Sequence, residues 1–255
     1  MNYKGNKYLE AKKHLKDKIL EFKNYDIICE PFCGIFGFSR AFLELNPDFK
    51  GEIWINDFDD KLINSIKDIK EKPMETINKL KEEIKKYKID KELSNDKSKS
   101  YLLNNISMAQ NERLCNIEKF NNKVNNYIEK INDYKIFFDK VKIFNLEFND
   151  FIKELPKNKK ILIFLDPPYF NSSNTCYDKY INKDTKANED YKDGTKLYID
   201  IYELFKKKNK NIKIIMIINK INFINYFFKD WLYKTFNGFY QNTNKNIKIH
   251  NIYLK

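Results

Sequence analysis

The chain has 255 residues, enough for one good-sized domain with a smaller insertion, and its formal net charge is +12. No apolar run approaches the roughly 20 residues that a membrane span needs, and residues 1–18 are too polar for a signal peptide. We therefore expect a soluble, intracellular protein with no membrane partner. Four scattered cysteines and two histidines give no spacing typical of a metal site, so no metal is expected.

The apolar runs are typical of parallel strands that are covered on both faces, and they lie at residues 27–30, 53–56, 141–146, 161–165 and 212–218. Helical patterns separate them, at residues 8–22, 37–45, 59–69 and 196–208. Alternation of strands and helices predicts an α/β fold with a doubly wound, Rossmann-like sheet.

Two segments break this alternation. Residues 70–140 are charged, mostly helical in period and without a convincing strand, which predicts an inserted, mainly helical region. Residues 171–195 are too polar to pack and predict a long loop, for which a functional lid and simple disorder are both open. The expected organisation is one α/β domain built from residues 1–69 and 141–255, with the insertion between its two halves.

The positive charge favours an acidic partner, and nucleic acid is the first candidate. Only Arg40 and Arg113 are arginines among the 48 basic residues, and Lys, Asn and Ile abound throughout the chain. An AT-rich coding sequence would also produce this composition. The charge alone therefore leaves open a solvated lysine surface with no partner.

One apolar run, ILIFL, continues directly into Asp166, Pro167, Pro168 and Tyr169. The two prolines end the strand because neither has an N–H group to donate to the sheet. In doubly wound sheets, ligands bind beyond the carboxyl ends of the strands. Asp166 is therefore predicted to lie where such a fold performs its chemistry, beside the aromatic ring of Tyr169.

Two other strands end in residues that suit a ligand. EPFCG, from Glu30 to Gly34, connects a strand to a helix, and a glycine in such a turn lets the backbone approach a ligand closely. INDFD puts Asp57 just beyond the next strand, where a carboxylate can accept hydrogen bonds from ribose hydroxyls.

Taken together and in this order, EPFCG, INDFD and DPPY resemble the Dam-type DNA adenine-N6 methyltransferases (D12 class, alpha order). The resemblance covers nearly the whole chain, and residues 70–140 occupy the place of that family's target-recognition region. It implies a Rossmann-like sheet of the methyltransferase type, S-adenosylmethionine as cofactor, and double-stranded DNA as partner. The implied reaction moves a methyl group to N6 of a flipped adenine, in a monomer or weak dimer. The sequence leaves open whether such an enzyme would serve a restriction-modification system, a virus or a regulatory pathway.

The resemblance also assigns roles to residues. Asp166, Pro167, Pro168 and Tyr169 would form the catalytic motif: the carboxylate and the Pro167 carbonyl accept the hydrogens of the amine, and the tyrosine ring supports the flipped base. The residues implied to bind the cofactor are Tyr8, Lys12, Glu30, Pro31, Phe32, Gly34, Asp57, Glu147 and Asp166. A weaker similarity at NERLCN implies DNA contacts by Arg113 and Asn116.

The chain departs from the family pattern at two places that matter. Glu10 stands where the first motif has a small residue, which would put a carboxylate near a cationic cofactor, and Phe36 stands where the glycine turn has its second glycine. Both departures keep open a noncatalytic nucleic-acid-binding protein on a degenerate methyltransferase scaffold. A methyltransferase acting on RNA adenine or on cytosine N4 is a further alternative. His14 and His250 are predicted to be surface or packing residues.

Overall fold

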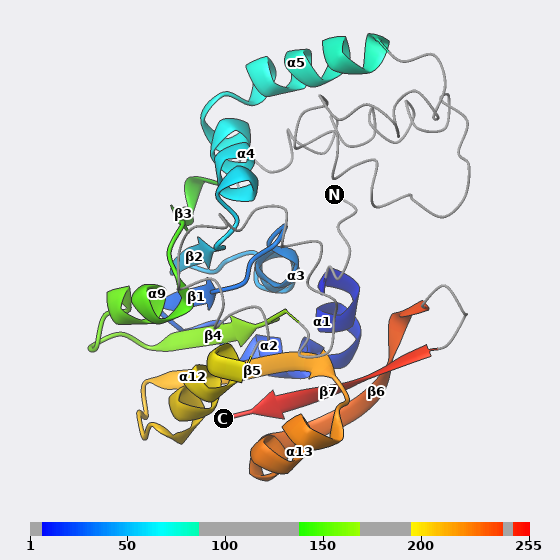
Figure 1. Ribbon diagram of the computed structural model, residues 1–255. Coiled ribbons are helices and arrows are strands. Elements are labelled where there is room, and N and C mark those ends of the chain that lie inside the picture. Colours follow the sequence, from blue (N-terminus) through cyan, green and yellow to red (C-terminus); the bar gives the residue numbers. More distant parts are fainter. Residues whose placement is uncertain (1–6, 87–137, 169–194, 242–246) are drawn as a thin grey trace.

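The computed structural model describes residues 7–86, 138–168, 195–241 and 247–255, which form a seven-stranded sheet with helices on both faces (Figure 1). The strand order is β3-β2-β1-β4-β5-β7-β6. The first five strands pair in parallel, and β7 runs antiparallel between β5 and β6. The strands are β1 (Ile27–Glu30), β2 (Glu52–Asn56), β3 (Val141–Phe144), β4 (Ile161–Leu165), β5 (Ile212–Asn219), β6 (Leu232–Gln241) and β7 (Ile247–Leu254). The predicted Rossmann-like α/β sheet is confirmed.

The helices of the described ranges are α1 (Tyr8–His14), α2 (Lys16–Glu21), α3 (Gly37–Leu45), α4 (Asp60–Glu71), α5 (Pro73–Lys85), α9 (Phe148–Glu154), α12 (Thr195–Lys206), α13 (Asn222–Phe228) and the 3-10 helix η1 (Lys229–Trp231). Three of the predicted helices form within two residues of their expected bounds. The fourth, expected over residues 8–22, is divided into α1 and α2 at Leu15, whose backbone leaves the helical region at φ −121 and ψ 5. The break keeps the buried Leu15 side chain in the core.

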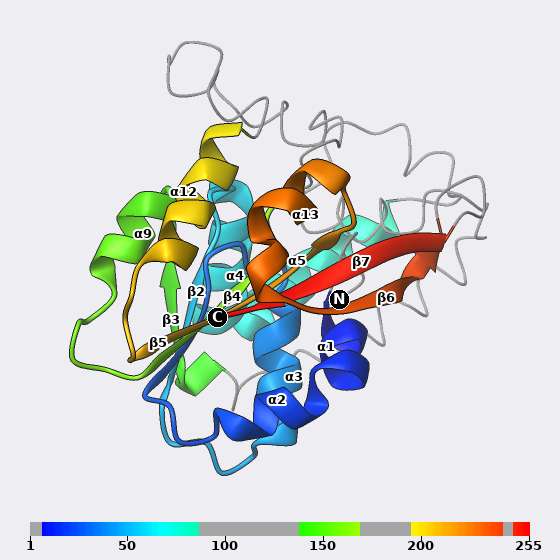
Figure 2. The same cartoon turned by 90° about the horizontal axis from the view of Figure 1, so that it is seen from below.

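Each face of the sheet has its own hydrophobic core. Successive residues of β4 alternate between them: Leu162 and Phe164 pack with α1 to α5, whereas Ile161, Ile163 and Leu165 pack with α9, α12 and α13. Figure 2 shows α1, α2 and α3 on one side of the strands and α9 and α12 on the other. Because both faces are covered, every residue of β4 is buried, which explains the continuous apolar run.

Several predictions fall outside the described residues. The range 87–137, most of the predicted insertion, and the range 169–194, which holds Tyr169 and most of the predicted loop, are among them, as are Arg113 and Asn116. Within the insertion, α5 is a helix as expected. The domain division stays a prediction. No helix in the described ranges is long and apolar enough to cross a membrane.

Candidate active site at the carboxyl edge of the sheet

The three sequence motifs meet at one edge of the sheet because β2, β1 and β4 are parallel neighbours. Glu30 ends β1, Asp57 follows β2 and Asp166 follows β4. The chain leaves β1 toward β2 and β3 on one side and returns to β4 on the other, so the strand order reverses between β1 and β4. Doubly wound folds bind their ligands beyond the strand ends at such a switch point.

The turn after β1 holds two residues in the left-handed region: Gly34 and Phe36 both have φ 47. A bulky residue with this backbone is strained by about 1 to 3 kcal/mol. The Phe36 ring offsets that strain by burial, since it is 1% exposed and packs edge-to-face on Phe138 at 5.7 Å. Phe36 therefore has a backbone that favours glycine, at the place where the Dam-type pattern has its second glycine.

Glu30 fastens this turn to the helix that follows it. Its Oε1 accepts a hydrogen bond of 2.6 Å from the backbone N–H of Ser39 in the first turn of α3, a helix whose own N-cap residue, Phe36, makes no side-chain cap. Burial raises the pKa of Glu30 to about 8, and the nearby charge of Asp166 adds to the rise. Its second oxygen, Oε2, is buried without a hydrogen-bond partner. An unsatisfied acceptor of this kind suits a cationic ligand group.

Asn56 and Asp57 tie the turn after β1 to the end of β2. The Asn56 amide donates to the carbonyls of Pro31 and Leu146, each at 3.0 Å, and its oxygen accepts from the Leu146 N–H at 2.8 Å. The Asp57 carboxylate accepts from the Gly34 N–H at 3.0 Å and from the Asp59 N–H at 3.1 Å. Burial raises the pKa of Asp57 to about 6. Asn56 was not among the predicted site residues, although it stands beside Asp57 in the same strand-end segment.

Asp166 contacts a buried lysine. Lys7 Nζ lies 2.9 Å from Asp166 Oδ1, and the Lys7 side chain is only 4% exposed. Burial raises the pKa of Asp166 to about 6, and the Lys7 ammonium opposes that rise both by its charge and by its hydrogen bond. Two residues further on, the Pro168 carbonyl accepts a hydrogen bond of 3.0 Å from the Tyr198 hydroxyl on α12. The Asp-Pro-Pro segment is thus held at both ends.

Tyr8 and Lys12 both contact Glu44 on α3, and their predicted contacts with a cofactor stay predictions. The Tyr8 hydroxyl donates to Glu44 on α3 at 2.5 Å, and Lys12 pairs with the same carboxylate at 2.9 Å near the surface. The structure brings Lys7, and not Lys12, to Asp166. A signal for Lys7 exists in the sequence, because the small residue Gly5 stands two positions before it, as the Dam-type first motif has a small residue before its lysine.

Glu10 and His250 extend the contact of Lys7 into a buried charge cluster, which we define as Lys7, Glu10, Asp166 and His250. Glu10 Oε2 lies 3.9 Å from Lys7 Nζ, and Glu10 Oε1 lies 3.0 Å from His250 Nδ1. Both side chains are nearly excluded from solvent, at 0% for Glu10 and 3% for His250. His250 was expected at the surface or in packing, and it does pack, edge-to-face on Phe236; its contact with Glu10 was not predicted.

The remaining predicted cofactor residues lie around the ends of β1 and β3. Pro31 is buried, and the partly buried Phe32 ring stacks on Phe148 with 5.3 Å between centroids and 14° between planes. Glu147 is half-buried, immediately before α9, and its side chain does not cap that helix. Their contacts with a cofactor stay predictions.

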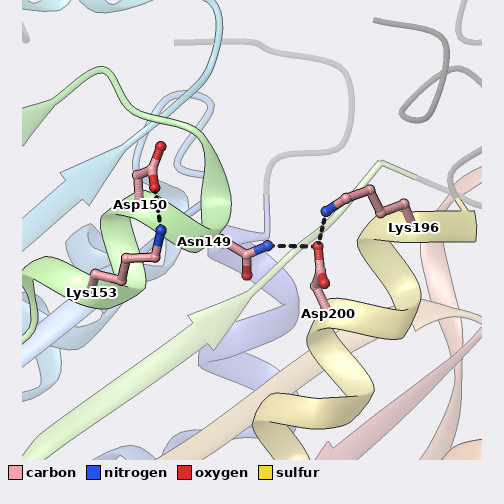
Figure 3. A network of polar contacts seen from close by, with 5 residues as sticks. All are labelled: Asn149, Asp150, Lys153, Lys196 and Asp200. Atoms are coloured by element: carbon pink, nitrogen blue, oxygen red, sulfur yellow. Dashed lines mark hydrogen bonds and ion pairs between the residues drawn. The ribbon is translucent and has the colours of Figure 1, made fainter. Parts of the chain in front are cut away.

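The helices α9 and α12 are joined next to the site by a polar bridge (Figure 3). Asn149 on α9 donates to Asp200 Oδ2 on α12 at 2.7 Å, and Lys196 donates to the same oxygen at 2.8 Å. Because α12 also carries Tyr198, this bridge fixes the helix that holds the Pro168 carbonyl. In the described part of the chain, no group of three or more His, Cys, Asp or Glu side chains could hold a metal ion.

No family model matches the chain, and no curated protein matches it significantly in sequence. Solved structures with low similarity include a precorrin-6y C5,15-methyltransferase from Geobacter metallireducens (8% identity, 96% of this chain, 87% of that chain, TM-score 0.43). A SAM-dependent methyltransferase from Aquifex aeolicus is another (9% identity, 98% and 95%, TM-score 0.39). The N-terminal domain of human METTL16 in complex with SAH is a third (8% identity, 96% and 68%, TM-score 0.37). Similarities this low carry no argument about cofactor or substrate.

Proposed function

We propose that the chain is an S-adenosylmethionine-dependent methyltransferase that acts on adenine N6 in DNA. The observation that carries this proposal is the meeting of the Glu30–Gly34 turn, Asp57 and the Asp166-Pro167-Pro168 segment at the β1/β4 switch point, with Lys7 paired to Asp166. A carboxylate on a stiff strand end, facing a glycine turn, is the arrangement that the resemblance to Dam-type enzymes requires.

The residues at this edge fit the proposed cofactor. Its ribose hydroxyls would bind Asp57, whose oxygens keep lone pairs beside their bonds to two backbone N–H groups. Its ammonium would bind Glu30 Oε2, the buried acceptor that has no partner. When bound, S-adenosylmethionine supplies an electrophilic methyl group on a positively charged sulfur. A cation at this edge of the sheet would stabilise the ionised forms of the buried acids Glu30, Asp57 and Asp166.

The chain's own contribution is to make a weak nucleophile reactive. The lone pair of the exocyclic adenine amine is delocalised into the ring, and two acceptors aimed at its hydrogens draw the nitrogen toward tetrahedral geometry. Lys7 holds Asp166 through Oδ1, so the amine would approach Oδ2. Tyr198 holds the Pro168 carbonyl, and the second acceptor assigned to the amine is the carbonyl of Pro167.

Asp166 is also the group that would take up the proton released by the reaction. Methyl transfer leaves N6 positively charged and with one hydrogen more than the product has. A carboxylate that is already hydrogen-bonded to that N–H can accept the proton without moving. The Lys7 ammonium favours the ionised carboxylate, which is the form that can accept. Asp166 would then release the proton to water.

The two departures that kept a noncatalytic scaffold in consideration are both accommodated by the surrounding residues. Glu10 Oε2 lies 3.9 Å from the Lys7 ammonium and Glu10 Oε1 lies 3.0 Å from His250, and Phe36 keeps the left-handed backbone of a glycine. The net charge of +12 supports a polyanionic substrate. DNA is favoured over RNA only by the resemblance, so the test must offer both.

The test uses tritiated S-adenosylmethionine with unmethylated genomic DNA and, separately, with total RNA, followed by nucleoside chromatography. We expect label in N6-methyldeoxyadenosine from the native chain and from Asp150→Ala, a control at an exposed acid on α9, and none from Asp166→Ala. Label only in RNA would move the substrate to RNA. A folded protein that transfers no label and gives no heat on mixing with S-adenosylmethionine would refute the proposal.

A further inference from the structure

Glu10 bridges Lys7 and His250 in a place where an acid is costly. The Glu10 side chain is fully buried, and its negative charge raises the pKa of Asp166, which works against an ionised catalytic carboxylate. A buried charge is tolerated only where it is paired, and here both partners are other members of the charge cluster. The contact of Glu10 with Lys7 therefore explains why an acid occupies position 10.

Lys7 needs a second anchor because its side chain is long and flexible. It stands directly before α1, and Glu10 lies three residues later, one turn along and on the same side. Asp166 attracts the ammonium from the sheet edge, and Glu10 attracts it from the helix. With both acids in place, the ammonium lies 2.9 Å from Asp166 Oδ1 and 3.9 Å from Glu10 Oε2.

His250 fixes Glu10 to the sheet. It lies on β7, in register with Asn219 of β5 and Phe236 of β6, so strands on both sides set its backbone position. Its ring packs edge-to-face on the Phe236 ring at 5.5 Å and 86°, and its Nδ1 lies 3.0 Å from Glu10 Oε1. The contacts run from rigid sheet to His250, Glu10, Lys7 and finally Asp166.

We propose that Glu10 and His250 are a positioning pair that holds the Lys7 ammonium on the Asp166 carboxylate. Neither residue touches the methyl acceptor; they act through Lys7, which aims Asp166 and keeps it ionised. The inference deepens the function proposed above and rests on it for its meaning in catalysis, but the pairing itself is a property of the folded chain.

The titratable groups that face Asp166 make the pairing testable, because Glu10 can influence Asp166 in two opposite ways. Those groups are Lys7 before α1, Glu10 on α1, His250 on β7 and Glu30 on β1. As a bare negative charge, Glu10 raises the pKa of Asp166, so Glu10→Gln lowers it. As the anchor of Lys7, it keeps the ammonium in place, so Glu10→Gln releases the ammonium and raises the pKa of Asp166.

The first experiment measures, without any methyl transfer, whether Glu10→Gln raises or lowers the pKa of Asp166. The free energy of urea unfolding is measured from pH 4 to 9 in two pairs of proteins. The native chain is compared with Asp166→Asn, and Glu10→Gln is compared with the double variant Glu10→Gln/Asp166→Asn. Each difference gives the contribution of Asp166 to stability. The folded-state pKa of Asp166, about 6, exceeds its ordinary value of 3.8, so the folded chain holds the proton more tightly. The stability that Asp166 contributes therefore falls as pH rises from about 4 to about 6 and is level above.

In the Glu10→Gln background, the positioning role predicts that the contribution of Asp166 to stability keeps falling to a pH about one unit or more higher than in the native chain. A fall that ends at lower pH than in the native chain, or at the same pH, would overturn the proposal. The measurement uses only unfolding, so it decides the pairing even if the chain transfers no methyl group to any substrate.

The second experiment measures catalysis. His250→Gln is compared with Asp150→Ala, the control at an exposed acid on α9. Loss of positioning predicts that kcat falls about tenfold or more while KM for DNA and cofactor stays within about threefold, and that the acidic limb of the kcat profile moves to higher pH. Asp150→Ala leaves the limb in place. An unmoved limb in His250→Gln would overturn the role of His250.

Discussion

Replacing Lys7 by methionine isolates the charge of one buried ammonium. Methionine keeps most of the apolar stem of lysine, so packing is largely preserved, and Asp166 and Glu10 lose the cation that lies 2.9 Å and 3.9 Å away. Removing one partner of a buried ion pair typically costs about 3 to 5 kcal/mol, because an uncompensated charge is left behind.

Protonation of Asp166 limits that cost in a way that depends on pH. With a folded-state pKa of about 6, neutralising Asp166 costs about 3 kcal/mol at pH 8 and well under 1 kcal/mol at pH 6. Protonation relieves the unpaired charge of Asp166 but not that of Glu10, so part of the loss remains at either pH. We therefore expect the loss of unfolding free energy in Lys7→Met to be larger at pH 8 than at pH 6, by up to about 3 kcal/mol.

The assay is urea unfolding at both pH values, followed by the fluorescence of the two tryptophans, Trp54 and Trp231. The matched control is Lys12→Met, whose pair with Glu44 is 40% and 45% exposed and should contribute little at either pH. Equal losses for Lys7→Met at pH 6 and pH 8, or a loss no larger than that of Lys12→Met, would refute the reasoning.

Three other substitutions test the parts that surround Asp166. Asn56→Leu removes three hydrogen bonds of 2.8 to 3.0 Å and leaves buried backbone groups unsatisfied, so urea unfolding should show a loss of about 3 kcal/mol or more; a loss below about 1 kcal/mol would contradict this. The folded-state pKa of Glu30 is about 8, so the free energy of unfolding of the native chain should fall as pH rises toward 8. Thermal unfolding should show a shallower fall with pH in Glu30→Gln. An equal dependence on pH in both proteins would argue against a protonated Glu30. Tyr198→Phe releases the Pro168 carbonyl, so kcat should fall about tenfold with cofactor affinity unchanged in calorimetry, and a native kcat would show that the carbonyl needs no holding.

The central parallel strands were predictable because both of their faces are covered. Every residue of β4 is buried, and no polar residue interrupts the pattern. The antiparallel strands β6 and β7 were missed for the opposite reason. In β7 the buried positions include His250 and Asn251, and Asn251 is satisfied by Thr235 and Asn225, which lie on other elements. Polar residues with distant partners look like loop residues when the sequence alone is read.

The helices α9 and α13 were missed because each is only seven residues long. Neither has a side-chain hydrogen bond at its N-cap, so no start signal marks them in the sequence. Helices this short are stabilised by what they pack against, and Phe151 of α9 and Phe228 of α13 are both buried in the core on the same face of the sheet. That packing exists only after the sheet has formed.

The position of the candidate site was predictable, but its electrostatics were not. Asp57 and Asp166 follow strand ends, and the α/β rule places strand ends at the ligand side. Lys7 has only the preceding Gly5 to mark it among many lysines, and Glu10 was noticed only as an irregularity in a motif. Nothing local in the sequence indicates that Lys7, Glu10 and His250 meet, because the contact requires both α1 and β7 to pack beside β4.

The interleaved place of β7 has a consequence for how the protein is made. Residues 247–254 enter the sheet between β5 and β6, although both of those strands leave the ribosome earlier. Until they arrive, β5 and β6 lack the neighbour that joins them, and Glu10 lacks the imidazole that faces it. Long-range pairing of this kind forms late in folding. A nascent chain therefore carries all its motifs before the charge cluster exists, and that cluster can assemble only after synthesis has delivered β7, the strand between β5 and β6.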